Sequence, residues 1–201
     1  MQLFLASALE YVKDFFVEKI GNIKGKTIGF ISNPADLDRK GDIEPRWVIG
    51  DKNMLKSLGG IIKTIDIREL KNDGLFEVIS NVDLLYVSGG NTRYFKTLAD
   101  ENGYQKIINE LIIKKGLPYI STSAGSCVMG TSIKYLDPGE FKIEQGYGLI
   151  NAMILPHWGS ENFKEEYEEV IPKLYNESQN IITLNDRQVI YVDSNGYEIL
   201  G

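Results

Sequence analysis

Short apolar runs alternate along this chain with segments whose apolar residues recur at helical spacing. The apolar runs are closed by Gly, Asn, Pro or Ser, which is typical of buried strands that end in loops. We expect strands at 1–6, 27–32, 61–67, 82–88, 117–122 and 148–155, and short strands within 181–200. We expect helices at 9–20, through Val48, Leu55 and Leu58, at 75–79, across 93–115 with an interruption near 101–103, at 124–129 and at 161–175. This alternation predicts an α/β fold with a doubly wound, mostly parallel sheet and helices on both faces.

The organisation of the chain favours one domain over residues 1–201. We find no internal repeat, low-complexity tract or linker rich in Pro or Ser. The contents of 43% hydrophobic and 25% charged residues are ordinary for a globular protein. A chain of this length can bury a substantial core.

Charge and cysteine content exclude several function classes. The 22 basic and 28 acidic residues give a net charge of −6, which counts against a nucleic-acid binder and against binding to a membrane surface. A single cysteine, Cys127, excludes a disulfide framework and a multi-cysteine zinc site, and a single histidine excludes a His-rich metal site. No apolar stretch approaches the ~20 residues of a membrane span. The N-terminal segment has no basic region of the signal-peptide type, so we expect a cytoplasmic protein.

The ends of the predicted strands carry the polar residues of interest. Asn33, Gly89-Gly90, Ser123 and His157 each follow an apolar run. In open α/β sheets the sites form beyond the carboxyl ends of the strands. We therefore expect these residues to gather at one edge of the sheet.

Ser123 lies between a predicted strand and a predicted helix and is flanked by small residues. This is the pattern of a nucleophile elbow, although Ser121 stands where the G-x-S-x-G pattern has its first glycine. In an elbow the amide of Ala124 points toward a developing oxyanion. The alternative interpretation is a serine that only caps the helix.

A serine nucleophile needs a base and an orienting acid. His157 is the only histidine and follows the strand predicted at 148–155, so we predict that it is the base; the alternative is a solvent-exposed loop histidine. For the acid we choose Asp137, in the loop between the elbow helix and the histidine strand, where Glu140 and Glu144 are alternatives. Asp137 also fits an ordinary Asp-Pro-Gly turn.

The glycine turn at 88–92 (SGGNT) offers backbone amides that could face Ser123. An ordinary turn is the alternative. A phosphate loop is disfavoured, because neither Walker spacing nor G-x-G-x-x-G is present.

Three motifs in this order, SGGNT at 88–92, TSAGS at 122–126 and LPH at 155–157, resemble the peptidase E (aspartyl dipeptidase) family of serine peptidases. The resemblance covers most of the chain and implies a class I glutamine amidotransferase-like fold. It implies Ser123 as nucleophile, His157 as base and Asp137 as the nearest match to the acid. It also implies Gly90 and Ala124 as the oxyanion hole, Asn91 and Thr92 as substrate-facing residues, cleavage after an N-terminal aspartate, and no metal or other cofactor.

One departure from this family bears on the substrate. The family carries an arginine-containing stretch after the histidine, but here the stretch 161–169 offers only Lys164 among five glutamates. Recognition of an aspartyl side chain would then depend on Arg93, Lys164 or Arg187 turning inward.

The sequence leaves other functions open. A non-catalytic small-molecule binder or regulatory protein could keep the same pocket geometry. A thiol enzyme is disfavoured because Cys127 lies inside the helix after the elbow. An α/β-hydrolase is disfavoured because its acid and base usually follow the elbow at much longer intervals. We expect a small-peptide substrate and a monomer or homodimer.

Overall fold

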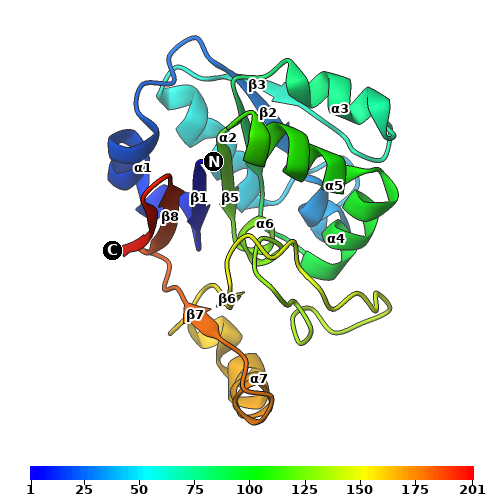
Figure 1. The fold of residues 1–201 in the computed structure, drawn as a ribbon, viewed down its shortest axis with the longest axis vertical. Coiled ribbons are helices and arrows are strands. Elements are labelled where there is room, and N and C mark those ends of the chain that lie inside the picture. The colour runs from blue at the N-terminus through cyan, green and yellow to red at the C-terminus, as the bar shows by residue number, and fades with distance from the viewer.

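The computed structural model describes residues 1–201 and is built around a seven-stranded sheet (Figure 1). The strands of this sheet are β1 (Leu3–Ala6), β2 (Thr27–Ile31), β3 (Ile61–Thr64), β4 (Leu84–Val87), β5 (Tyr119–Thr122), β8 (Val189–Asp193) and β9 (Gly196–Leu200). Their order is β3-β2-β4-β5-β1-β8-β9, with β3 to β1 parallel and with β8 and β9 antiparallel. The prediction of a doubly wound, mostly parallel sheet is confirmed.

Helices cover both faces of this sheet, which is why its central strands are apolar along their whole length. The helices are α1 (Lys13–Ile20), α2 (Arg46–Ser57), α3 (Asp73–Ser80), α4 (Thr92–Glu101), α5 (Tyr104–Ile107), α6 (Ala124–Cys127) and α7 (Lys164–Asn176), and a π-helical segment, Ile108–Lys114, continues α5. Every residue of β1, β4 and β5 is buried. A parallel strand buried on both faces has no solvent side on which polar residues could alternate.

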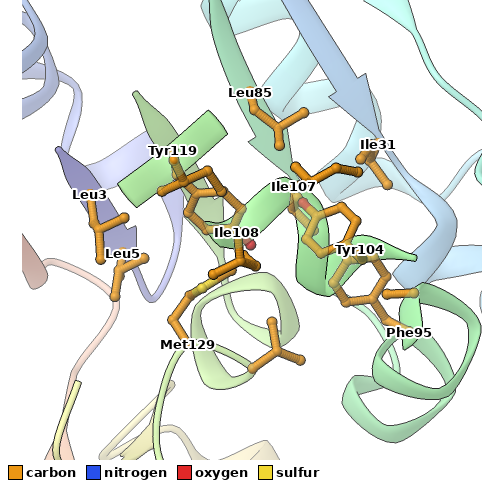
Figure 2. Packing of buried hydrophobic residues seen from close by; sticks show 14 of the residues in the cluster. Leu3, Leu5, Ile31, Leu85, Phe95, Tyr104, Ile107, Ile108, Tyr119 and Met129 are labelled. Atoms are coloured by element: carbon orange, nitrogen blue, oxygen red, sulfur yellow. The ribbon is translucent and has the colours of Figure 1, made fainter. Parts of the chain in front are cut away.

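The two faces of the sheet are filled by separate clusters of side chains. Leu3, Leu5 and Tyr119 point toward α4 and α5, where they pack with Phe95 and Tyr104 (Figure 2). Alternate residues of the same strands point the other way, toward α1 and α2. That second cluster includes Phe4, Phe16, Phe30, Tyr86 and Ile120. The period of two along each strand produces this division.

A second, smaller unit holds the segment that contains His157. Strands β6 (Met153–Leu155) and β7 (Ile181–Thr183) form a parallel two-stranded sheet. In Figure 1 this pair and α7 lie together below the main sheet. The buried side chains of Cys127, Met153, Leu155 and Tyr167 belong to one cluster, which ties the unit to α6.

The structure corrects the strand predicted at 148–155. Only Met153–Leu155 is a strand, and the residues before it are irregular. Gly148 has a φ of +70°, and its N–H donates to Gly130 O, while the N–H of Ile150 donates to Met129 O. These hydrogen bonds hold the segment against the turn after α6, so it cannot extend β6.

Two predicted helices also differ at their starts. The helix predicted at 9–20 is a 3₁₀ turn, Leu9–Tyr11, followed by α1, and the helix predicted at 161–175 begins with a 3₁₀ turn at Glu161–Phe163. No helix of the protein is long and apolar enough to cross a membrane.

Candidate active site

Ser123 forms a sharp turn between β5 and α6. Its φ of 46° and ψ of −112° are unusual for a residue with a side chain. A Cβ on Gly125 would lie 2.6 Å from Val87 O, and a Cβ on Gly89 would lie 3.1 Å from Ser123 Cβ. The small residues around Ser123 are therefore needed for close packing of the backbone. The Ser123 side chain makes no capping hydrogen bond to α6, so the helix-cap interpretation does not apply.

His157 lies directly opposite the Ser123 hydroxyl. Its Nε2 atom is 3.0 Å from Ser123 Oγ. The imidazole stacks on the Phe163 ring with 4.7 Å between centroids, and only 18% of its side chain is exposed. His157 is therefore not the free loop histidine of the alternative interpretation.

Asp186 holds the other side of the imidazole. Its Oδ1 atom is 2.6 Å from His157 Nδ1. An ionised carboxylate can only accept, so Nδ1 carries the proton and Nε2 presents its lone pair to Ser123. Asp186 follows β7, the parallel neighbour of the strand that precedes His157.

Ser7, at the end of the central strand β1, links these groups. Its hydroxyl accepts a hydrogen bond of 2.8 Å from the His157 N–H and donates one of 2.9 Å to Asp186 Oδ1. The residue is 1% exposed. Our sequence analysis named neither Ser7 nor Asp186 as a site residue, although Ser7 follows β1 and Asp186 follows β7.

The choice of Asp137 as the acid beside His157 is wrong. Asp137 accepts a hydrogen bond of 2.7 Å from the N–H of Thr92, at the start of α4, and makes none to His157. Asp137 itself lies in a turn, with a φ of 45°. Its carboxylate is stabilised at the N-terminus of α4, because the helix dipole favours a negative charge there. The two alternatives, Glu140 and Glu144, are exposed and make no hydrogen bond to His157.

Two backbone amides beside Ser123 have no partner within the protein. Neither the Gly90 N–H nor the Ala124 N–H donates a hydrogen bond to another protein atom. Gly90 has a φ of 142°, and a Cβ there would lie 2.1 Å from Pro34 O, so only glycine fits. Next along the chain, the Asn91 side chain accepts from Tyr94 N at 2.8 Å and caps α4.

Ser123, His157 and Asp186 line one cavity of about 750 Å³. Among its lining residues are Gly90, Ala8, Asn91, Thr92, Ser123, Asp137, His157 and Asp186. Cys127 also touches the cavity, but the residue is 2% exposed and burial raises the pKa of its thiol well above the usual range. A thiol that stays protonated is a poor nucleophile.

Asp51 lies under the elbow, at the wall of the same cavity. It is 6% exposed, and burial raises the pKa of its carboxyl to about 7. Its oxygen accepts hydrogen bonds from Tyr86 and, at 3.4 Å, from Thr122, the residue before Ser123. Sequence reasoning missed this buried carboxyl because Asp51 lies within a helix of mixed polarity.

Comparison with known proteins agrees with this geometry. The model of peptidase family S51 matches residues 3–200. An uncharacterized peptidase of Listeria monocytogenes serovar 1/2a is 26% identical over 197 residues, covering 94% of this chain and 93% of that protein. An uncharacterized peptidase of Pasteurella multocida strain Pm70 is 26% identical over 201 residues, covering 96% of this chain and 94% of that protein.

Solved structures share the fold. A crystal structure of a protein named for peptidase E, from Listeria monocytogenes EGD-e, has a TM-score of 0.82 at 24% identity and covers 99% of this chain and 97% of its own. The crystal structure of a peptidase from an acI-B1 Actinobacterium has a TM-score of 0.74 at 20% identity and covers 100% of this chain and 87% of its own. The family match favours an enzyme over the non-catalytic binder considered above. The protein is a serine-type peptidase, and the chain belongs to peptidase family S51.

Proposed function

We propose that this peptidase hydrolyses small peptides through an acyl-enzyme on Ser123, with His157 as general base and Asp186 as the acid of the triad. The observation that carries the proposal is a continuous chain of hydrogen-bonded side chains from Ser123 through His157 to Asp186. Ser123 Oγ is 3.0 Å from His157 Nε2, and His157 Nδ1 is 2.6 Å from Asp186 Oδ1. These are the distances that general-base catalysis requires.

The chemistry follows from the tautomer that Asp186 imposes. As Ser123 Oγ attacks the scissile carbonyl carbon, its proton moves to His157 Nε2, and Asp186 stabilises the imidazolium. The imidazolium then gives that proton to the leaving amine, and the C–N bond breaks. Water attacks the resulting ester with His157 again as base, and the acid product leaves Ser123 free.

The amides of Gly90 and Ala124 form the oxyanion hole in this proposal. Both N–H groups are free of internal partners. Ala124 directly follows Ser123, and Gly90 follows Gly89, where a Cβ would lie 3.1 Å from Ser123 Cβ. Donors that are already fixed in place stabilise the charge of the tetrahedral intermediate without reorganisation, and one such donor typically contributes ~10²–10³ in kcat.

The size of the cavity supports a short peptide as substrate. A volume of about 750 Å³ lies within the range of small-molecule pockets, roughly 300–1,000 Å³. Asn91 and Thr92 line this cavity, and we propose that the free Nδ2 of Asn91 contacts the substrate, since its Oδ1 is taken by Tyr94 N.

Hydrolysis of a panel of dipeptides tests this function. Ser123→Ala and His157→Ala should lose activity by on the order of 10³-fold or more, with an unchanged circular dichroism spectrum. Ser80→Ala, an exposed serine on α3, is the matched control and should keep wild-type rates. Wild-type hydrolysis by purified Ser123→Ala protein would contradict the proposal.

A further inference from the structure

Two of the carboxylates that line the catalytic cavity and lie outside the proposed triad are Asp38 and Asp137. One oxygen of Asp137 accepts from Thr92 N, and the other makes no hydrogen bond within the protein. Neither carboxylate takes part in any of the ion pairs of the protein, whereas Asp36 and Glu44 both pair with Arg39.

A third carboxylate comes close to this cavity from α7. Glu166 is half-buried, directly precedes the cavity-lining residue Tyr167, and forms no ion pair. Burial and then the charge of Asp137 raise the pKa values of both Glu166 and Asp38. The charge of Asp137 therefore acts on both Glu166 and Asp38, and a cation placed beside Asp137 would relieve that repulsion.

The three basic side chains considered for an acidic substrate do not line the cavity. Arg93 is buried and donates to Phe141 O, Lys164 is exposed and lies outside the cavity, and Arg187 lies over the Tyr11 ring at 5.8 Å. The single basic side chain that lines the cavity is Arg46. It begins α2, which covers the sheet face opposite to that of α4 and Asp137.

Asp38 and Asp137 line the cavity that contains Ser123, and Glu166 directly precedes the cavity-lining Tyr167. The ligand that these carboxylates meet is therefore the peptide positioned for attack. We propose that Asp38, Asp137 and Glu166 select peptides with a cationic N-terminal residue, lysine or arginine, in place of the aspartyl residue that the peptidase E resemblance implies. The inference rests on the proposed function. The N-terminal residue of such a peptide carries two positive charges, one on the α-ammonium and one on the side chain.

Rates on three dipeptides that differ only in the first side chain test this selection. Lysyl-leucine, norleucyl-leucine and aspartyl-leucine have a cationic, a neutral and an anionic first side chain on the same scaffold. We expect kcat/KM to fall in that order, by roughly tenfold or more at each step, because opposite charges a few ångströms apart interact strongly when water is partly excluded.

Variants separate the carboxylates from the rest of the cavity. Asp137→Asn and Glu166→Gln should each lower the lysyl-to-norleucyl ratio of kcat/KM several-fold. Glu165→Gln, the exposed neighbour on the same helix, is the matched control and should leave the ratio unchanged.

The outcomes distinguish this inference from the proposed function. Faster hydrolysis of aspartyl-leucine, or equal rates for lysyl and norleucyl substrates, would overturn the selection while Ser123-dependent hydrolysis stands. A ratio that Asp137→Asn and Glu166→Gln leave unchanged would also overturn it. Loss of both hydrolysis and fluorophosphonate labelling of Ser123 would overturn the function, and the selection with it.

Discussion

Ser123 and His157 meet because both residues adopt backbone conformations that side-chain-bearing residues seldom take. Their φ values are 46° and 58°. Each such conformation costs ~1–3 kcal/mol, and the surrounding packing must hold it. The conformation of Ser123 is stabilised by close packing against Gly89 and Gly125. The conformation of His157 is stabilised by the hydrogen bond from its N–H to Ser7 and by stacking on the Phe163 ring.

Asp186→Asn tests which carboxylate orients the imidazole. An amide can donate to Nδ1, which favours the tautomer with its proton on Nε2, so that Nε2 no longer accepts from Ser123. We expect kcat to fall by on the order of 10³–10⁴-fold on every substrate, measured under saturating dipeptide. Asp137→Asn is the control: it should change KM for cationic substrates and spare kcat. A large loss of kcat in Asp137→Asn, with kcat unchanged in Asp186→Asn, would identify Asp137 as the acid instead.

Ser7→Ala tests a positioning residue that contacts His157 and Asp186 and makes no hydrogen bond to Ser123. The change leaves the buried His157 N–H without its acceptor and removes one donor from Asp186. A hydrogen bond to a charged group is worth ~1.5–3 kcal/mol, so kcat should fall roughly 10- to 100-fold. Ser7→Thr keeps the hydroxyl and should recover most of the rate at unchanged KM. Equal loss in both variants would point to packing alone.

At the scale of elements, the alternation of apolar runs and helical segments is enough to predict the parallel sheet and the edge at which the site forms. The rule that sites follow strand ends holds for Ser123 after β5 and also for His157, although β6 lies in the separate two-stranded sheet. It would also have placed Ser7 after β1 and Asp186 after β7, but Asn185-Asp186 looks like turn chemistry. Its contact with His157 depends on β6 pairing with β7, two segments far apart in the chain. Local patterns do not specify such long-range pairing.

The turn after β4 depends on Gly90. In Gly90→Ala the new Cβ would lie 2.1 Å from Pro34 O at a φ of 142°, so the turn must move. We expect the free energy of unfolding to drop by ~2 kcal/mol or more and activity to fall with the displaced amide. Gly74→Ala, in the open first turn of α3, is the matched control and should be neutral or slightly stabilising in urea unfolding. Equal stability of the two variants would contradict this account.

At the scale of the whole molecule, the buried carboxyl of Asp51 links stability to pH. Burial raises its pKa from 3.8 to about 7, so between these values the folded chain keeps a proton that the unfolded chain has released. The free energy of unfolding must therefore decrease as pH rises through this window, by about 1.4 kcal/mol per unit of pKa difference, or a few kcal/mol at most.

Asp51→Asn should remove this contribution, because the amide keeps a similar shape without titrating. Urea unfolding at about pH 5 and about pH 8 should show a larger loss of stability for the wild type than for the variant. The other titrating groups are common to both proteins, so they cancel in the comparison. Identical pH dependence would mean that Asp51 ionises as an ordinary surface carboxylate does.

The Ser123 hydroxyl, activated by His157 and Asp186, is the nucleophile in our proposal. Its most direct test is peptide mapping after reaction with a fluorophosphonate, which phosphonylates an activated serine. We predict one label per chain, on Ser123, and loss of labelling in His157→Ala. Labelling of another residue, or none in a folded wild-type protein, would contradict the account.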